Sequence, residues 1–265
     1  MSEAPLVEIS NATIWRGSTR VFENLDLTIE QHERVAILGP NGSGKTTLLK
    51  AISRELYPAT RPDTVFRILG RDRWNVWELR RQIGIVSDDL QRRYTPRTTA
   101  LEVVVSGFHS SIGIHGVLSA RVDDAQLRAA TQILADLGIE DLARTPLMHM
   151  STGQQRRCLL GRALVHEPKT LILDEPTAGL DLAASFDYLN RLRRLAAVGR
   201  NVLIVTHHLN ELPPEVERVI LLAGGRVVAD GAKREVLDAD VLSGVYGTPV
   251  KVTEVDGYFL ASPGR

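Results

Sequence analysis

The stretch Gly39-Pro-Asn-Gly-Ser-Gly-Lys-Thr-Thr47 decides the fold of this chain. It follows the apolar run Val35–Leu38 and precedes the apolar, helix-like segment 48–52. The order strand, glycine-rich loop, helix and the spacing G-x-x-x-x-G-K-[ST] are those of a phosphate-binding loop. Glycine lets the backbone approach an anion closely, and the N–H groups that open the following helix attract negative charge. Because a merely flexible glycine loop would not need this strand and helix, we expect a bound nucleoside triphosphate.

This loop supplies a charge and a metal ligand besides its N–H groups. The mobile ammonium of Lys45 suits the outer phosphates, and the Thr46 hydroxyl is a suitable Mg²⁺ ligand. The predicted nucleotide-binding residues of the stretch are Gly39, Pro40, Asn41, Gly42, Ser43, Gly44, Lys45, Thr46 and Thr47.

The composition is that of a globular protein without a strong electrostatic field. Of 265 residues, 43% are hydrophobic and 24% charged, and 32 basic residues balance 32 acidic ones. This balance does not mark a nucleic-acid binder, so no nucleic-acid partner is expected. The single cysteine, Cys158, lies in a helical pattern and is expected to be buried as a small hydrophobe.

Two further features concern location. The N-terminus Met-Ser-Glu-Ala-Pro lacks a basic region followed by an apolar one. No apolar run approaches the about 20 residues needed to cross a bilayer. We therefore expect a cytoplasmic chain, and another chain would have to provide any membrane span.

Apolar periodicity and turn residues predict alternating strands and helices. Several short strands are expected within 6–29, and a helix from about Thr46 should end near Leu56 because prolines follow. Further expected elements are strands at 65–69, 83–86, 170–173 and 202–206, helices at 76–81 and 182–197, and hairpins around Gly224-Gly225 and Asp256-Gly257. The pattern is α/β: a mostly parallel sheet flanked by helices and interrupted around 90–150 by a helical insertion.

The segment 107–120 of this insertion is rich in serine and glycine and holds His109 and His115. Two histidines six residues apart are weak evidence for a metal site. We therefore expect them to be solvated loop residues.

Two carboxylates follow the apolar run 171–173. Asp174 and Glu175 stand at the C-terminal edge of a predicted strand, where open α/β sheets bind ligands. Asp174 is expected to reach Mg²⁺, directly or through water, and Glu175 to take a proton from an attacking water. Capping of the next helix is the alternative, which the phosphate-binding loop disfavours. His207, after another strand, is a candidate γ-phosphate sensor, although His208 beside it leaves the choice open.

As a set, these residues resemble the nucleotide-binding subunit of ATP-binding cassette (ABC) proteins. Ala178-Gly179-Leu180-Asp181 is similar to the family's D-loop, and Thr206-His207 is similar to its switch histidine. Ser151-Thr152-Gly153-Gln154-Gln155 is similar to the LSGGQ signature and lies just before the strand that ends in Asp174. Together with the phosphate-binding loop, the resemblance covers almost the whole chain.

The resemblance implies a fold and a domain division. The fold would be α/β, a P-loop NTPase (RecA-like) core with a mostly parallel sheet, an N-terminal antiparallel β subdomain and an inserted α-helical subdomain. Residues 5–240 would form the ABC ATPase domain, with the helical subdomain at about 90–150. Residues 241–265 would be a C-terminal extension with a β-hairpin.

The resemblance also implies hydrolysis of ATP with Mg²⁺ by two copies of the chain. Ser151 and Gly153, at a helix start that favours anions, would face the γ-phosphate held by the second copy, which gives a head-to-tail dimer. Gln154 and Asp181 fall among the nucleotide-binding residues, and Trp15 occupies the place of the aromatic residue that stacks on adenine. A separate permease would hold the chain at the inner face of the cell membrane.

Two places depart from the family pattern. Met150 and Thr152 stand where Leu and Gly are usual, which leaves the anion-facing groups in place. After the strand 83–86, the family usually has a glutamine that touches Mg²⁺ or the attacking water. Here the aligned residue is Asp88, with Gln91 three residues later. A carboxylate repels a triphosphate unless a metal is bound, and the sequence leaves open which of the two residues serves at this position.

Two narrower resemblances point to different cargoes. The segment 106–114 is similar to ABC ATPases related to the molybdate-type ModF group, whereas 242–247 is more similar to ATPases of iron-siderophore, haem and cobalamin importers. We expect an importer and leave its cargo open. The alternative is a soluble ABC ATPase that acts on nucleic acid or another macromolecule without a permease, and Asp88 favours it.

Overall fold

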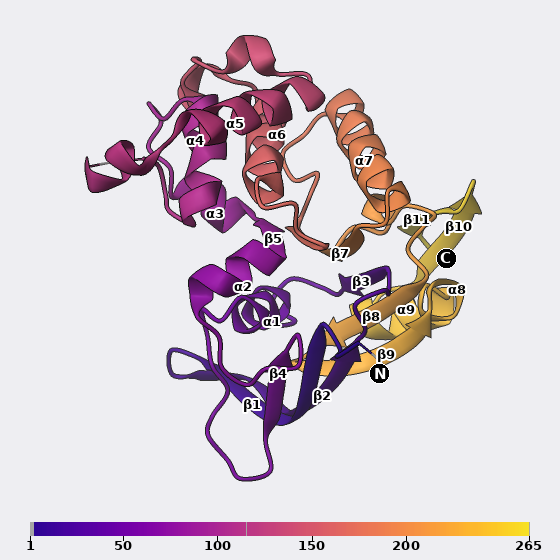
Figure 1. Ribbon diagram of the computed structural model, residues 1–265. Coiled ribbons are helices and arrows are strands. Elements are labelled where there is room, and N and C mark those ends of the chain that lie inside the picture. Colours follow the sequence, from indigo (N-terminus) through magenta and orange to yellow (C-terminus); the bar gives the residue numbers. More distant parts are fainter. Residues whose placement is uncertain (1–2, 115, 265) are drawn as a thin grey trace. The chain divides into compact units, whose positions relative to one another are not determined.

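A computed structural model describes residues 3–114 and 116–264 (Figure 1). Contacts group the described residues into two compact units. The first consists of the described parts of Met1–Val76 and Asn201–Arg265, and the second of those of Trp77–Arg200. Each unit buries its own set of apolar side chains.

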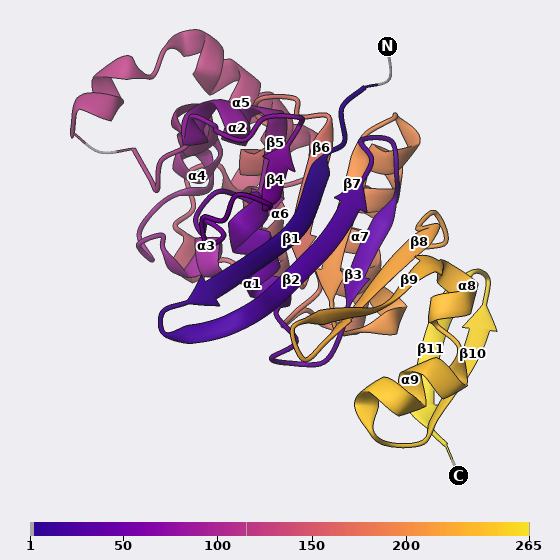
Figure 2. The ribbon, with the colours of Figure 1, turned by 90° about the horizontal axis from the view of Figure 1, so that it is seen from below.

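The first unit contains a three-stranded antiparallel sheet near the N-terminus. β1 (Val7–Arg16) pairs with β2 (Thr19–Ile29) on one side and with β4 (Val65–Ile68) on the other (Figures 1 and 2). The expectation of several short strands was wrong, because β1 and β2 continue through register shifts between Ile9 and Trp15. Such bulges interrupt the alternation of apolar and polar residues without ending the strand.

The phosphate-binding loop extends from a second sheet. The strands that the first unit contributes are β7 (Asn201–Thr206), β3 (Val35–Leu38), β8 (Arg218–Ala223) and β9 (Arg226–Ala232), in that order. β3 runs parallel to both of its neighbours, while β9 runs antiparallel to β8. All residues of β3 are buried, which explains its continuous apolar run.

The helix after the loop is shorter than predicted. α1 (Lys45–Ile52) ends before Arg54, whose φ of 59° is left-handed. The Arg54 side chain is buried, and its Nη2 donates to the carbonyl oxygens of Phe66 (3.0 Å) and Arg71 (3.3 Å). The helix therefore ends at a left-handed residue that lies before the prolines, where Glu55 N–H and Leu56 N–H donate back to the carbonyl oxygen of Lys50.

The second unit is mostly helical around a parallel strand pair. Its strands are β5 (Ile83–Val86) and β6 (Thr170–Asp174). Its helices are α2 (Val76–Gln82), α3 (Asp88–Arg92), α4 (Ala100–Ser106), α5 (Asp124–Asp136), α6 (Thr152–Leu164) and α7 (Leu182–Ala197). Gly161 of α6 allows close packing, because a Cβ there would lie 3.0 Å from Val104 of α4 and 3.1 Å from Ile133 of α5.

Short 3-10 helices lie between the longer elements, and the first two of them overlap segment 107–120, where loop residues were expected. They are η1 (Gly107–His109), η2 (Gly116–Arg121), η3 (Glu140–Leu142) and η4 (Leu147–His149) in the second unit and η5 (Leu209–Glu211) in the first. His109 was expected to be solvated, but it is half-buried and its Nε2 is enclosed. His115 lies outside the described residues.

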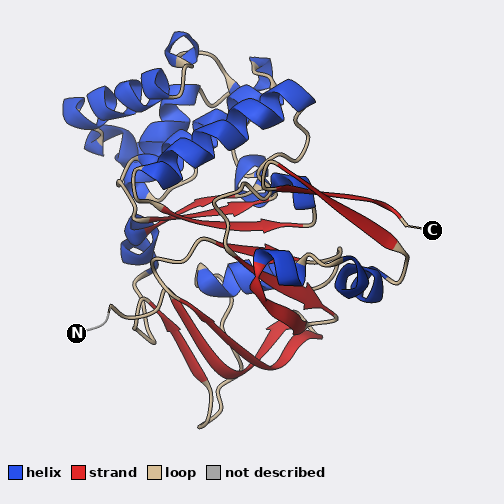
Figure 3. Ribbon diagram, turned by 90° about the vertical axis from the view of Figure 1, so that its right-hand side faces the viewer, coloured by secondary structure: helices blue, strands red, loops and turns tan. Residues whose placement is uncertain are grey.

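The chain ends in two short helices and a hairpin, all in the first unit. α8 (Lys233–Val236) and α9 (Ala239–Tyr246) precede β10 (Val250–Val255) and β11 (Tyr258–Pro263). Figure 3 shows the hairpin strands beside the terminus marked C. Asp256 and Gly257 both have positive φ, as a two-residue hairpin turn requires, so this predicted hairpin is confirmed. Within the described residues, no helix is long and apolar enough to cross a bilayer.

A buried lysine joins this hairpin to the rest of the first unit. The Lys233 ammonium donates to the carbonyl oxygens of Leu212 (3.2 Å), Pro213 (2.9 Å) and Gly257 (3.0 Å). It also lies 5.2 Å from the centre of the Phe259 ring. Because burial penalises the charged form, the pKa of Lys233 falls from its ordinary value to about 8.

This pKa predicts how stability responds to alkaline pH. Between pH 8 and 10.5, the unfolded chain binds the Lys233 proton more tightly than the folded chain. The folding cost of burying the ammonium is fully present below pH 8 and is relieved through this interval. Relative to Lys233→Met, the wild-type free energy of unfolding should therefore rise by on the order of 2 kcal/mol.

Urea denaturation at pH 7.5, 9 and 10 measures this difference. Lys251→Met is the matched control, since Lys251 is an exposed lysine on the hairpin that Lys233 contacts and has no burial to relieve. A flat difference for Lys233→Met as well would contradict the burial argument.

Candidate active site

The phosphate-binding loop packs so closely that two of its glycines admit no side chain. A Cβ on Gly39 would lie 2.2 Å from the carbonyl oxygen of Leu222 in β8. Gly44, which precedes α1, has φ 109°, and a Cβ there would lie 2.6 Å from the Phe22 ring. Packing against β2 and β8 thus fixes the position of the loop at these two glycines.

The inner side of the loop carries donors that suit a phosphate. The Lys45 ammonium is buried and donates to the carbonyl oxygens of Gly39 (2.7 Å) and Pro40 (3.1 Å). The Ser43 hydroxyl is buried and has no hydrogen-bond partner among the described residues. Thr46 is exposed at the start of α1. A cationic amine, an unpaired hydroxyl and the first N–H groups of a helix fit a triphosphate, and the exposed threonine hydroxyl fits its metal ion.

His207 emerges at the same edge of the sheet as this loop. Thr206, the last residue of β7, pairs in register with Leu38, the last residue of β3. Their successors, His207 and Gly39, therefore open neighbouring loops. The His207 ring lies 3.8 Å from that of His208, measured between ring centroids. His207 is half-buried and His208 is exposed, which makes His207 the one better enclosed by the fold.

Trp15 lies in the antiparallel sheet of the first unit. It belongs to β1, faces Arg20 of β2 in register, and is 44% exposed. An accessible indole at a strand end can stack on a planar base. The contact with adenine that the family resemblance implies for Trp15 stays a prediction.

The two carboxylates lie at the C-terminal end of β6 in the second unit. Leu173 pairs in register with Val86 of β5, so Asp174 and Ser87 leave the strand pair at the same edge. Asp174 and Glu175 are both half-buried. Glu175 has φ 49°, a left-handed conformation that costs a non-glycine residue about 1–2 kcal/mol. Strain of this kind concentrates at functional positions, which agrees with the proton-accepting role predicted for Glu175.

The signature-like segment begins α6 with a capping box. The Ser151 hydroxyl accepts from the N–H of Gln154 (3.3 Å), while the Gln154 side-chain oxygen accepts from the N–H of Ser151 (2.8 Å). Ser151 is exposed and Gly153 is half-buried. Gln154 therefore has a structural role besides the nucleotide contact predicted for it.

The D-loop-like turn lies beside this helix start. Asp181 caps α7 by accepting from the N–H of Ala184 (2.8 Å). A Cβ placed on Gly179 would lie 3.6 Å from Thr152 Cγ2. Within the second unit, the fold thus brings together two motifs that are more than 20 residues apart in the sequence.

The structure pairs Asp88 with a cation of its own chain. Asp88 opens α3 and forms a very short ion pair with Nη2 of Arg156 in α6, and its other oxygen lies 3.4 Å from Nη2 of Arg92. Gln91, one turn later, donates from Nε2 to Oε1 of Gln155 (2.7 Å). The carboxylate expected to repel a triphosphate is therefore neutralised by Arg156.

Arg156 is a functional candidate that sequence reasoning missed. Its side chain is 1% exposed, and Nη2 also donates to the carbonyl oxygen of Ala178 (3.3 Å). A signal was available: Arg156 occupies the apolar face of α6 that also carries Leu159, Leu160 and Ala163. A charged residue at that spacing requires a buried partner.

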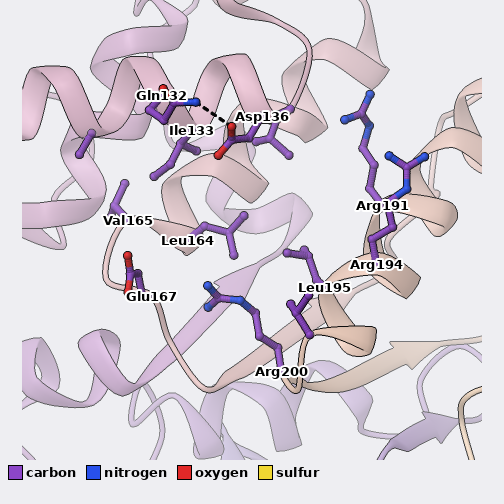
Figure 4. A pocket seen from close by; sticks show the side chains of 13 residues that line it. Gln132, Ile133, Asp136, Leu164, Val165, Glu167, Arg191, Arg194, Leu195 and Arg200 are labelled. Atoms are coloured by element: carbon purple, nitrogen blue, oxygen red, sulfur yellow. Dashed lines mark hydrogen bonds between the residues drawn. The ribbon is translucent and has the colours of Figure 1, made fainter.

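A separate pocket of about 480 Å³ lies between α5, the end of α6, and α7 in the second unit (Figure 4). Ile133, Leu164 and Leu195 contribute apolar surface, and Gln132 donates to Asp136 (2.8 Å) at its edge. None of the predicted nucleotide or metal residues lines it.

A glycine-rich loop between a buried strand and a helix, with carboxylates and a histidine at strand ends, defines a P-loop nucleoside triphosphatase. Residues 22–178 match the model of the ABC transporter family. The chain belongs to this family, as an ATP-binding and ATP-hydrolysing subunit.

Similar proteins cover nearly the full length of the chain. It is 30% identical over 253 residues to a putative ABC transporter ATP-binding protein of Streptococcus mutans serotype c, with 95% of each chain covered. It is 35% identical over 266 residues to the hemin import ATP-binding protein HmuV of Myxococcus xanthus, covering 97% of this chain and 94% of that one. The dimeric post-hydrolysis structure of the ATP-binding cassette MJ0796, bound to ADP and Pi, has a TM-score of 0.70 and 27% identity and covers 86% and 99% of the two chains.

The loop packing predicts unequal effects of two glycine substitutions. Gly39→Ala should lower the free energy of unfolding by about 3 kcal/mol, because the new methyl group meets backbone that cannot turn aside. Gly42→Ala should cost only about 1 kcal/mol, because its Cβ enters open space and only its positive φ is unfavourable. Chemical denaturation measures both, and an equal or larger loss for Gly42→Ala would contradict the packing argument.

Proposed function

We propose that two copies of this chain close head-to-tail on two ATP molecules with Mg²⁺ and drive a separate membrane permease of an importer. The observation that carries the proposal is the exposed, serine-capped start of α6, because a helix N-terminus attracts an anion and this one does not follow the chain's own phosphate-binding loop. A dimeric cassette with ADP and Pi and a hemin import subunit among the similar proteins support it.

The first unit would bind the nucleotide. Main-chain N–H groups of 39–47 cradle the phosphates, Lys45 balances their charge, and Trp15 stacks on the adenine ring. His207 contacts the γ-phosphate. Thr46 supplies one ligand for Mg²⁺, which when bound would offset phosphate charge.

The second unit would supply the groups that act on the γ-phosphate. Asp174 is the other protein ligand of Mg²⁺, and Glu175 accepts a proton from the attacking water. Ser151, Gly153, Gln154 and Asp181 would serve the nucleotide bound by the second copy. Exposure of Ser151 and Asp181 leaves both side chains accessible to such a partner.

We further propose one ABC ATPase domain at 5–240, with a helical subdomain at about 90–150, and a C-terminal extension at 241–265. The permease would hold the subunit at the cytoplasmic face of the cell membrane. The alternative is a soluble ABC ATPase that acts on nucleic acid or another macromolecule without a permease, and Asp88 is the residue that favours it. Since the ion pair with Arg156 explains the carboxylate at position 88, Asp88 no longer favours that function.

The role of Glu175 predicts that Glu175→Gln reduces ATP turnover by about 10²-fold or more, because an amide cannot accept the proton. Equilibrium ATP binding should stay within about twofold of wild type, since no loop donor is removed. Phosphate release and a fluorescent ATP analogue measure the two quantities. Glu167→Gln is the control, because Glu167 is a glutamate of the same unit with a similar φ of 50°. Undiminished turnover in Glu175→Gln would remove this residue from catalysis.

The dimer and the permease need separate tests. With hydrolysis blocked by Glu175→Gln, added ATP should double the mass seen in sedimentation, and Ser151→Ala should weaken this association. A chain that stays monomeric at saturating ATP would overturn the proposed head-to-tail dimer. Affinity capture from detergent-solubilised membranes should recover a stable integral membrane partner; recovery of nucleic acid with DNA- or RNA-stimulated turnover would favour the alternative function instead.

A further inference from the structure

The charged pair Asp88–Arg156 links three segments of the second unit. Arg156 lies in the second turn of α6, Asp88 opens α3, and the carbonyl oxygen of Ala178 belongs to the D-loop-like turn. Each of these segments follows or contains a motif predicted to serve ATP hydrolysis. The guanidinium group of Arg156 therefore joins α6 to the other two segments.

The burial of this pair is uneven. The Arg156 side chain is 1% exposed, whereas that of Asp88 is 43% exposed. Nε and Nη1 of Arg156 have no hydrogen-bond partner among the described residues. The guanidinium has thus lost most of its hydration, and Asp88 is the carboxylate that pairs with it. The position of the Arg156 guanidinium should consequently depend strongly on Asp88.

A second side-chain contact joins α3 to α6 beside the ion pair. Asp88 and Gln91 are three residues apart and project from the same side of α3. They meet consecutive residues of α6, Arg156 and Gln155. Gln155 in turn donates to the carbonyl oxygens of Leu147 (2.8 Å) and Met150 (3.1 Å), directly before the helix start. The Asp88–Arg156 and Gln91–Gln155 contacts together position α6 and the backbone that leads to Ser151.

The solvent-exposed partner of Asp88 provides an internal comparison. Arg92 lies 3.4 Å from the same carboxylate, but its side chain is 80% exposed. An exposed ion pair contributes little, because water and salt screen it and the long side chain loses freedom. Of the two arginines, only Arg156 can transmit the position of α3 to the helix.

We propose that Asp88 and Arg156 are positioning residues for hydrolysis: the ion pair between half-exposed Asp88 and buried Arg156 holds the signature-like helix start and the D-loop-like turn in the arrangement that the second copy's nucleotide requires. The effect on turnover rests on the proposed function. The effect on local structure does not. Asp88 contacts neither the nucleotide nor the metal in this scheme, so ATP binding to the chain's own loop is independent of it.

A cycle of substitutions tests the pair. The variants are Asp88→Asn, Arg156→Gln and the double variant, with Arg92→Gln as the control for the exposed partner. Asp88→Asn should lower ATP turnover roughly ten- to hundredfold, because misplacing a catalytic element by about 1 Å has effects of that size. ATP affinity should stay within about twofold. The double variant should recover turnover to within about threefold of wild type, since it leaves no unpaired buried charge. Arg92→Gln should match wild type.

Hydrogen exchange gives a readout that does not depend on activity. Asp88→Asn should speed exchange at the amides of 152–158 and 178–184 by about tenfold, with little change in β3 and β8 of the first unit. Unchanged exchange, or normal turnover per folded molecule in Asp88→Asn, would overturn the proposal. A double variant as impaired as Asp88→Asn would overturn it as well. If the wild type has no ATP turnover but exchange responds as expected, the proposed function fails and the structural role of the pair stands.

Discussion

The structure depends on burying parallel strands on both faces. Strands such as β3 and β6 carry mostly apolar side chains, because neither face of the strand reaches water. Polar chemistry is therefore displaced to the residues that follow the strand. Lys45 and His207 follow β3 and β7 in the first unit, and Asp174 and Glu175 end β6 in the second. The location of the candidate active-site groups is thus a consequence of strand burial.

Buried cations are the second organising feature, and each is held by oxygen atoms. Lys233 and Arg54 donate to main-chain carbonyl oxygens, which anchor the C-terminal hairpin and the end of α1. Arg156 instead pairs with a carboxylate. Carbonyl oxygens are supplied by the fold whatever the sequence, whereas a carboxylate depends on one side chain. Of these three cations, Arg156 is therefore the most sensitive to a single substitution.

Local patterns predicted much of the fold. The helix at Leu182–Ala197, the strand pair β5 and β6, and the hairpins at Gly224-Gly225 and Asp256-Gly257 all follow the expected positions, because periodicity and turn residues are short-range signals. Long-range contacts decided the failures. At the end of α1, left-handed Arg54 contacts the carbonyl oxygens of Phe66 and Arg71, and the length of β1 follows from pairing through bulges. The sequence likewise placed Asp88 near the site but did not show that Arg156, 68 residues away, neutralises it.

The ion pair between Asp88 and Arg156 also constrains how this chain can evolve. Replacing Asp88 alone leaves the buried Arg156 cation without its carboxylate partner, and replacing Arg156 alone leaves Asp88 with the exposed Arg92. Either single substitution should therefore impair the protein, whereas the two substitutions together should be tolerated. The two positions should therefore be inherited as one unit, and a lineage that alters one of them is expected to carry a compensating change at the other.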